Sequence, residues 1–212
     1  MKVAVFKFIT EENFVQSDAE KLRGFMGNKY QDNVLFHNHL SLYEFLYKSP
    51  LIQYKVLDKK LCIIGINEGI EVLKENIMDL REVDIKNNKI SILNIQVEEN
   101  EKELKVGASL NKYKFETLWI ALNSNNYSRY QKGEYTLDKA LVNNLLEIFS
   151  MEKIFVEQEI LAKGTYKTHT IIKKDTKLLG ISGEFISNVE LPDYISLGKR
   201  KSIGFGTIKC IG

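Results

Sequence analysis

The chain has 212 residues, a formal net charge of +2 at pH 7, and 44% hydrophobic and 27% charged residues. This length fits one large domain or two small ones, and the composition is that of a globular protein, which excludes disordered and fibrous classes. No apolar run reaches membrane-spanning length and the N-terminus lacks a signal-peptide cleavage pattern, so we expect a cytoplasmic protein with no membrane partner.

The charge is unevenly distributed along the chain. Residues 163–212 contain nine Lys or Arg against four Asp or Glu. A basic C-terminal segment favours a polyanionic partner, although a solvated lysine face is the simpler interpretation of charge alone. The two cysteines, Cys62 and Cys210, lie in apolar strand-like runs, and we expect buried thiols rather than a disulfide.

The first half of the chain predicts alternating strands and helices. A run rich in Val and Phe predicts a strand over residues 2–9, and residues 17–30 predict a helix with Ser17 and Glu20 as a capping box. Residues 51–66 predict two strands that turn at Asp58-Lys59.

A second helix is predicted over residues 67–80, with Asn67 as its cap. Residues 82–97 predict a hairpin that turns at Asn87-Asn88, and the acidic stretch from Glu98 to Glu103 is a candidate domain boundary.

The second half is rich in strands, and it contains a helix over 136–150 capped by Thr136. We expect its strands over residues 104–110, 114–122, 153–160, 169–174, 178–187 and 205–211. Trp119 is expected in the core and His169 on a surface strand. Between strands, residues 123–135 predict a polar loop with interleaved aromatic and basic residues that would suit stacking on unpaired bases; a merely solvated loop is the simpler interpretation.

This order of elements predicts an α+β protein built from tandem ferredoxin-like (βαββαβ) domains of the RAMP or RRM-like kind. The predicted domains are residues 1–98 and 104–212. The duplication is inferred from element order, since the two halves share no residue-level repeat.

Two of the three histidines, His37 and His39, are separated by one residue and followed by Tyr43 and Tyr47. Histidine titrates near neutral pH, with an ordinary pKa of ~6.5, so the pair is a candidate acid and base. A surface loop that happens to hold two histidines is the competing interpretation. A metal site is a weaker third one, because no third ligand has matching spacing.

The C-terminal segment "LGKRKSIGFGTIKC" is the second candidate site. Glycine lets a backbone approach a phosphate closely, and the adjacent cations and serine add charge and a hydroxyl donor. The spacing fits neither a P-loop nor a dinucleotide fingerprint, because a strand follows it rather than a helix. A β-hairpin with a basic turn is the structural alternative.

Together these residues resemble a known family. The tandem ferredoxin-like pattern with a C-terminal glycine-rich loop resembles the RAMP superfamily of CRISPR-associated proteins. The blocks "AEKLRGFMGNKY", "LFHNH", "SPLIQYKV" and "CIIGINEGIEVL", in that order and spacing, resemble the b-type branch of the CRISPR repeat-processing endoribonucleases. The resemblance covers most of the first 75 residues and about the last 20.

The resemblance implies an endoribonuclease that cuts the CRISPR precursor transcript within each repeat to give guide RNAs. Neither a metal ion nor a cofactor is expected, because the nucleophile is the 2′-hydroxyl of the RNA and the products carry 5′-hydroxyl and 2′,3′-cyclic or 3′ phosphate ends. The histidines of the "LFHNH" block are implicated in catalysis in the family, which implies a catalytic role for His37 and His39. The glycine-rich loop contacts RNA in the family, which implies RNA contacts at Gly198, Lys199, Arg200, Lys201, Ser202, Gly204 and Gly206.

The residue types also fit this chemistry by themselves. In-line attack needs a base, an acid and cations beside the phosphate, and two histidines could supply the first two. Lys29 and Lys48, which flank the histidine block, or the lysines of the loop could supply the charge. Tyr43 or Tyr47 could orient a histidine or donate the proton, and Tyr47 is the tyrosine assigned to the catalytic group.

Two other classes of function compete with this one. A non-catalytic RNA-binding subunit of a CRISPR effector complex could share the fold and the loop, but it has no need of paired histidines. A metabolic enzyme that binds phosphate through the glycine-rich loop is more distant. The expected partners are CRISPR repeat RNA, as precursor and processed guide, with other effector subunits and a second copy of the chain as further candidates.

Overall fold

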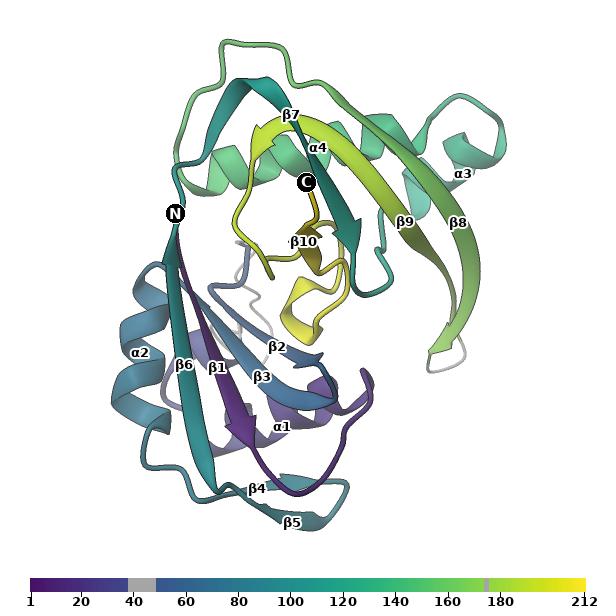
Figure 1. The fold of residues 1–212 in the computed structure, drawn as a ribbon. Coiled ribbons are helices and arrows are strands. Elements are labelled where there is room, and N and C mark those ends of the chain that lie inside the picture. The colour runs from purple at the N-terminus through teal and green to yellow at the C-terminus, as the bar shows by residue number, and fades with distance from the viewer. Residues whose placement is uncertain (38–48, 174–175) are drawn as a thin grey trace. The chain divides into compact units, whose positions relative to one another are not determined.

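The computed structural model describes residues 1–37, 49–173 and 176–212, and these form two compact units (Figure 1). The N-terminal unit comprises Lys2–Glu101 and Ser202–Gly204. The C-terminal unit comprises Met1, Lys102–Lys201 and Phe205–Gly212. A short segment near the end of the chain therefore belongs to the N-terminal unit. The domain limits 1–98 and 104–212 stay a prediction.

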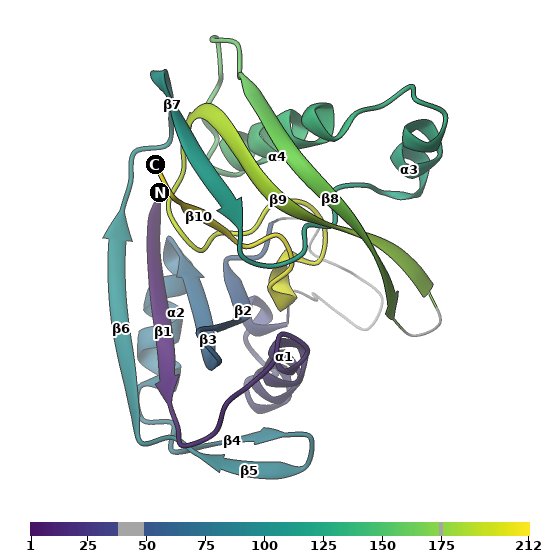
Figure 2. The same ribbon diagram turned by 45° about the vertical axis from the view of Figure 1, so that its right-hand side comes forward.

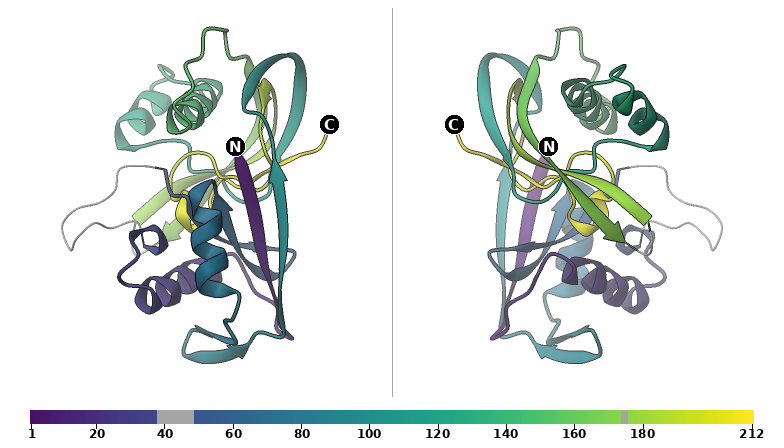
Figure 3. Two further views of the ribbon diagram at one scale, coloured as in Figure 1. Left: turned by 90° about the vertical axis from the view of Figure 1, so that its left-hand side faces the viewer. Right: turned by 90° about the vertical axis from the view of Figure 1, so that its right-hand side faces the viewer.

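The N-terminal unit is a four-stranded sheet with α1 and α2 on the same side of it (Figure 3). Its elements are β1 (Lys2–Ile9), α1 (Asp18–Lys29), the 3-10 helix η1 (Val34–Phe36), β2 (Ile52–Leu57), β3 (Lys60–Ile66), α2 (Glu68–Ile77), β4 (Glu82–Ile85), β5 (Asn88–Ser91) and β6 (Asn94–Glu101). The antiparallel strand order β2-β3-β1-β6 is that of a ferredoxin-like unit, with the β4–β5 hairpin inserted before the last strand.

The core of this unit lies between the sheet and the two helices. Alternate residues of β1 point toward the helices, and Phe6 and Phe8 are fully buried there. The helices contribute apolar stripes with the predicted spacing of three or four residues, namely Ala19, Leu22, Met26, Ile70, Leu73 and Ile77.

Of the two tight turns predicted in the N-terminal unit, one forms at the predicted residues and the other is shifted by one residue. Asp58 and Lys59 join β2 to β3 as predicted, with φ of 50° and 61°. The β4–β5 hairpin turns one residue earlier than predicted, at Lys86 and Asn87, where φ is 59° and 63°. The prediction is wrong by one residue because Asn88 already pairs in the β4–β5 ladder.

The predicted side-chain caps of α1 and α2 are wrong. Ser17 occupies the N-cap position of α1, but in the described part of the chain its side chain makes no cap hydrogen bond. The carboxylate of Asp18 instead accepts from the backbone N–H of Val15 at 3.1 Å. Likewise Asn67 makes no cap bond among the described residues, because its side-chain oxygen accepts from the N–H of Lys2 at 3.0 Å.

The C-terminal unit repeats the same sheet order. Its elements are β7 (Lys105–Phe115), α3 (Ser124–Gln131), α4 (Leu137–Met151), β8 (Ala162–Lys173), β9 (Thr176–Glu190), the 3-10 helix η2 (Lys201–Ile203) and β10 (Ile208–Cys210). The order β10-β7-β9-β8 matches strand for strand that of the N-terminal unit, and α4 covers one face of the sheet (Figure 2). The predicted tandem ferredoxin-like fold is confirmed. The segment between β9 and β10, which holds the glycine-rich loop, stands where such a unit has its second helix.

Three local predictions in this unit are wrong. Residues 124–131 form α3 rather than a loop, since Asn123 caps them by accepting from the N–H of Asn126 at 2.8 Å. Residues 153–160 form no strand. The strand predicted over 114–122 ends at Phe115, which already belongs to β7. The cap of α4 is confirmed, because Thr136 accepts from the N–H of Lys139 at 3.2 Å.

The C-terminal core contains a group of stacked aromatic rings. Trp119 is fully buried as predicted, and its ring stacks on Phe115 with centroids 5.0 Å apart. Its indole N–H donates to Asn144 of α4 at 2.9 Å, which satisfies the one polar group of the ring.

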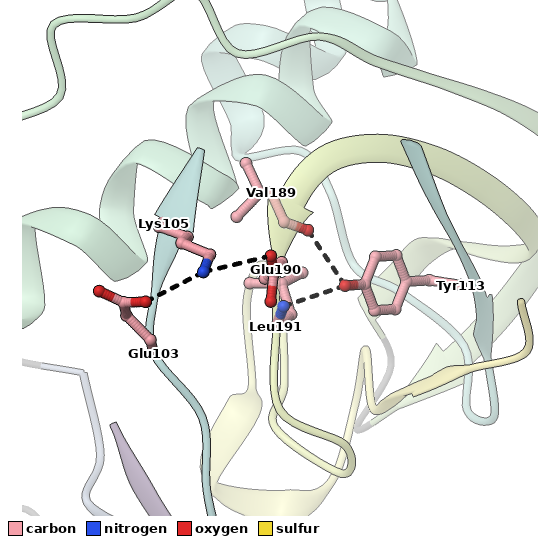
Figure 4. A network of polar contacts seen from close by, with 6 residues as sticks. All are labelled: Glu103, Lys105, Tyr113, Val189, Glu190 and Leu191. Atoms are coloured by element: carbon pink, nitrogen blue, oxygen red, sulfur yellow. Dashed lines mark hydrogen bonds and ion pairs between the residues drawn. The ribbon is translucent and has the colours of Figure 1, made fainter. Parts of the chain in front are cut away.

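Tyr113 of β7 holds the end of β9 (Figure 4). Its hydroxyl donates to the carbonyl of Val189 at 3.0 Å and accepts from the N–H of Leu191 at 2.9 Å. Burial is the main cause that raises the pKa of this phenol to about 12, so it remains a neutral donor at physiological pH. These bonds fix the point where the chain leaves the sheet toward the glycine-rich loop.

The cysteine prediction is confirmed in part. Cys62 and Cys210 are both free thiols; Cys62 is buried, whereas Cys210 is half-buried.

Among residues 1–37, 49–173 and 176–212, no helix combines the length and apolar character needed to cross a bilayer.

Candidate functional site

His37 lies directly after η1, and several contacts fix its backbone. Asn33 caps η1 by accepting from the N–H of Leu35 at 3.1 Å, and the N–H of His37 donates to the carbonyl of Val34 at 3.3 Å. The guanidinium of Arg23 on α1 donates to the carbonyl of His37 at 2.7 Å. The peptide at His37 is therefore held by the first helix and by the turn that precedes it.

The imidazole of His37 is half-buried. Its Nε2 lies 3.0 Å from the carbonyl oxygen of Gln31. Because a carbonyl oxygen can only accept, Nε2 carries the proton in this contact. Gly27 makes room for the side chain, since a Cβ at that position would come within 3.3 Å of the Cβ of His37.

The other members of the predicted catalytic group lie outside the described residues. His39, Tyr43, Tyr47 and Lys48 fall within residues 38–48. Their assignment stays a prediction from the sequence.

Lys29, at the end of α1, borders a cavity of the N-terminal unit. The cavity has a volume of about 580 Å³, and its lining includes Lys29, Tyr30 and Arg81 as well as acidic side chains from the end of α2 and the start of β4. The ring of Tyr30 stacks on Phe36 with centroids 4.5 Å apart, and the ammonium of Lys29 lies 5.7 Å from the centroid of the Tyr30 ring. Nothing in the local sequence pattern indicates that Tyr30 and Arg81 border this cavity, because Tyr30 follows α1 and Arg81 precedes β4, and these segments meet only in the folded chain.

The glycines of the C-terminal loop allow its backbone to adopt positive φ angles and make close contacts. Gly198, Gly204 and Gly206 have φ of 80°, 80° and 67°, a region that side chains other than glycine rarely adopt. A Cβ at Gly198 would lie 2.5 Å from the carbonyl of Ile120, and one at Gly206 would collide with the carbonyl of Leu197. All three glycines are buried, so their clearest role in this structure is to let the loop pack closely.

The three consecutive cations of the loop lie in different environments. Lys199 and Arg200 are exposed. Lys201 is nearly buried, and its ammonium pairs with the carboxylate of Glu147 on α4 at 2.7 Å. Ser202 is half-buried. Of the three consecutive cations of the loop, Lys199 and Arg200 are therefore the two whose charges face solvent.

The remaining sequence candidates make other contacts. Tyr135, from the predicted base-stacking loop, is buried, and the guanidinium of Arg129 lies over its ring at 5.4 Å. His169 is exposed on β8, as predicted, and bonds to the hydroxyl of Ser182 at 2.7 Å. Within the described ranges, no group of three or more His, Cys, Asp or Glu residues is arranged to hold a metal ion.

Comparison with known proteins matches both halves of the chain to one family. Residues 1–103 match the family model described as the Cas6b N-terminal domain, and residues 105–211 match the Cas6b C-terminal domain. An uncharacterized protein of Methanocaldococcus jannaschii is 31% identical over 140 residues, which is 63% of this chain and 95% of that protein.

Solved structures agree with the family match over the whole chain. A structure described as the crystal structure of Cas6b has a TM-score of 0.90 at 29% identity, with both chains covered completely. A second, described as the CRISPR RNA processing endoribonuclease Cas6b, has a TM-score of 0.78 at 26% identity, again with complete coverage of both chains. A structure described as CRISPR associated protein Cas6 shares the fold, with a TM-score of 0.60 at 14% identity and complete coverage of both chains. The chain therefore belongs to the Cas6b family, which confirms the resemblance of its motifs to the b-type CRISPR repeat-processing endoribonucleases.

Proposed function

We propose that this protein is an endoribonuclease that cleaves CRISPR precursor transcripts within each repeat to give guide RNAs. The observation that carries this proposal is the match of both halves of the chain, in order, to the two Cas6b domains. The half-buried histidine held at the end of η1 and the exposed cations of the C-terminal loop supply residue types that the reaction needs.

The proposed reaction uses the substrate's own nucleophile. The 2′-oxygen attacks the adjacent phosphorus while the bond from phosphorus to the 5′-oxygen breaks, which gives a 2′,3′-cyclic phosphate and a 5′-hydroxyl. A base removes the proton of the 2′-hydroxyl, and an acid returns a proton to the departing 5′-oxygen. We assign these two roles to His37 and His39, with Tyr47 as a residue that orients one of them or donates the proton.

Cations then stabilise the charge that develops on the phosphate. Lys29, Lys48, Lys199 and Arg200 are the candidates, and neither a metal ion nor a cofactor takes part in the proposed mechanism. CRISPR repeat RNA is the proposed partner, both as precursor and as processed guide. Other effector subunits and a second copy of the chain remain proposals, as does the cytoplasm as the compartment.

The test is incubation of end-labelled repeat RNA from the same genome with the purified protein in EDTA. We expect one cut within the repeat, with a 5′-hydroxyl on the downstream fragment. Binding without cutting would instead support the non-catalytic subunit of an effector complex. A protein that neither binds nor cuts the repeat would overturn both assignments.

A further inference from the structure

The segment that links α4 to β8, residues 152–161, presents apolar side chains to solvent, and its path can be followed in Figure 1. Phe155 is 85% exposed, and Ile154 and Leu161 are exposed as well. An exposed phenylalanine keeps a large apolar surface in water, which is unfavourable until another molecule covers it. The whole segment lies within the C-terminal unit.

The start of this segment has a fixed conformation at the end of α4. The N–H of Lys153 donates to the carbonyl of Ser150 at 3.1 Å, and the N–H of Ile154 donates to the carbonyl of Phe149 at 2.9 Å. Lys153 has φ of 58°, so these two bonds form a Schellman motif with a lysine in the position where glycine is usual. A residue other than glycine keeps such a φ only where the surrounding chain holds it.

Asn188 of β9 fixes the other end of the segment. Its side-chain amide donates to the carbonyl of Glu159 at 3.0 Å, and its side-chain oxygen accepts from the N–H of Leu161 at 2.8 Å. Ile160, between these two residues, is buried. Because both ends are fixed, the segment presents Phe155 to solvent from a defined position.

A groove of about 420 Å³ lies between this segment and the last turns of α4. Its lining consists of Leu146, Phe149, Ser150, Lys153, Ile154, Phe155 and Val156. The first four of these follow the spacing i, i+3, i+4, i+7 of one helical face. A face with this spacing packs against a second helix, ridges into grooves, so the groove suits a helical ligand.

The charges around the groove restrict the kind of ligand. Residues 152–159 contain three glutamates and one lysine, and Glu157 and Glu159 are exposed. The C-terminal end of α4 adds a partial negative charge. This charge repels the phosphates of RNA, and it also repels the same surface of a second copy in a two-fold symmetric pair. It attracts lysine and arginine side chains that flank an apolar surface.

We propose that this surface binds an amphipathic helix of a partner protein, whose apolar face is flanked by lysine or arginine residues. Phe155 is the central contact, because buried aromatic side chains contribute most of the affinity at interfaces of this kind. Glu157 and Glu159 pair with the flanking cations. The proposal does not depend on the proposed RNA cleavage, since it rests on the apolar exposure and the charge of the C-terminal unit alone.

The test uses the full chain and two fluorescently labelled synthetic helices of about 18 residues, or five turns. Both peptides carry leucine at the same positions along one face, and the remaining positions are lysine in one peptide and glutamate in the other. Fluorescence anisotropy should show saturable binding of the Leu/Lys peptide, about tenfold tighter than that of the Leu/Glu peptide. Phe155→Ser should weaken binding of the Leu/Lys peptide about tenfold, and so should the double variant Glu157→Gln with Glu159→Gln.

Matched control variants separate this surface from general effects of substitution. Ile172→Ser removes an apolar side chain that is 71% exposed on β8. Glu98→Gln with Glu101→Gln removes two exposed charges from β6. Both control proteins should bind the Leu/Lys peptide like the wild type. The midpoint of thermal unfolding should be unchanged in Phe155→Ser, because most of this side chain lies in water.

Three results would overturn the proposal. The first is equal binding of the two peptides, or binding that depends on neither Phe155 nor the two glutamates. The second is weaker binding of repeat RNA by Phe155→Ser, which would make the surface part of an RNA interface. The third is a wild-type dimer in sedimentation that Phe155→Ser dissociates, which would make a second copy the ligand.

If Phe155→Ser does not fold, the double glutamine variant decides. Cleavage of repeat RNA by the wild type is measured separately from peptide binding. The proposed function and this inference can therefore fail independently of each other.

Discussion

His37 is the one proposed catalytic residue whose surroundings the described part of the chain includes. Its backbone is fixed by Arg23 and by η1, while its imidazole is half-buried with one nitrogen on the carbonyl of Gln31. A fixed peptide with a partly accessible ring suits a general acid or base, which must meet its substrate in one orientation.

We predict that His37→Ala slows single-turnover cleavage by about 10²- to 10⁴-fold, the range typical of losing a general acid or base. RNA affinity and the midpoint of thermal unfolding should change little, because the backbone contacts with Arg23 and Val34 that hold the peptide at His37 do not involve the ring. His169→Ala, which removes an exposed histidine from β8, is the control and should cut normally. Unfolding of the His37→Ala protein would make this histidine structural, and normal cleavage would end the catalytic assignment.

Lys55 on β2 is fully buried beside Cys62, its register partner on β3. Burial holds the pKa of this ammonium well below its usual range, and burial also raises the pKa of the Cys62 thiol to about 12. Both groups therefore favour their neutral forms in the folded protein.

The lysine gives a testable dependence of stability on pH. In the unfolded chain Lys55 binds its proton up to its ordinary pKa of ~10.4, so between the lowered folded pKa and that value the unfolded state holds more protons. Stability should then rise with pH through this window, by at most ~1.4 kcal/mol per pH unit. The measurement is urea unfolding at pH 6.5 and 7.5, below the range in which the Cys62 thiol, with an ordinary pKa of ~8.5, adds the opposite effect. The rise should be smaller in Lys55→Met than in the wild type, and parallel pH dependences would show that Lys55 stays charged.

At the scale of single elements, the two predicted serine and threonine caps provide a natural comparison. Thr136 accepts a hydrogen bond from Lys139 at the start of α4, whereas Ser17 makes no cap bond at the start of α1 within the described residues. Thr136→Ala should therefore lower the free energy of unfolding by about 1 kcal/mol, as measured in urea. Ser17→Ala is the matched control, and an equal loss there would contradict the cap assignment.

Substitutions in the glycine-rich loop test whether this element contributes to RNA affinity. Lys199 and Arg200 are its exposed cations, so Lys199→Ala with Arg200→Ala should weaken binding of repeat RNA and lower the salt slope by roughly one unit for each lost phosphate contact. Lys59→Ala with Lys89→Ala removes two equally exposed charges from hairpins of the N-terminal unit and controls for net charge. An unchanged affinity and slope in the loop variant would place the loop outside the RNA interface.

At the scale of the whole molecule, the two units share one sheet topology but differ in the segment after the third strand. The N-terminal unit continues into α2, whereas the C-terminal unit continues into the glycine-rich segment. The same scaffold thus carries a core-forming helix in one unit and an anchored basic loop in the other. Because the sheet order is common to both units, this segment is what distinguishes them.

The whole reaction is tested by metal, pH and substrate together. Cleavage should persist in EDTA, and a 2′-deoxy nucleotide 5′ of the scissile phosphate should abolish cutting while it permits binding. The single-turnover rate should show a bell-shaped pH profile with limbs within about two units of the ordinary histidine pKa of ~6.5. Bound RNA is anionic and favours protonated imidazoles, which moves both limbs upward. Strict dependence on Mg²⁺ or cutting of the deoxy substrate would contradict the mechanism, whereas a rate that never falls at high pH counts only against histidine as the acid.

The sequence by itself determined the elements with strong periodicity and the family. The apolar run of β1, the stripes of α2 and α4 and the Asp58-Lys59 turn obey local rules of spacing and turn chemistry, and the motif blocks around His37 carried the resemblance that the family match confirms. Prediction was wrong where the local pattern is weak. Residues 124–131 are polar and were expected to form a loop, but they form a helix that is capped by Asn123, and the neighbouring residues do not indicate this cap.

Only the tertiary structure decided which side chains of the C-terminal loop are buried and which are exposed. The sequence presents Lys199, Arg200 and Lys201 as equivalent cations, yet the last is nearly buried against Glu147, a residue 54 positions away. Likewise Gln16 bonds to Ile203 across 187 positions. Burial and partners of this kind depend on contacts between distant segments, and a local pattern holds no information about them, so the division between anchoring and exposed charge appears only when the chain is folded.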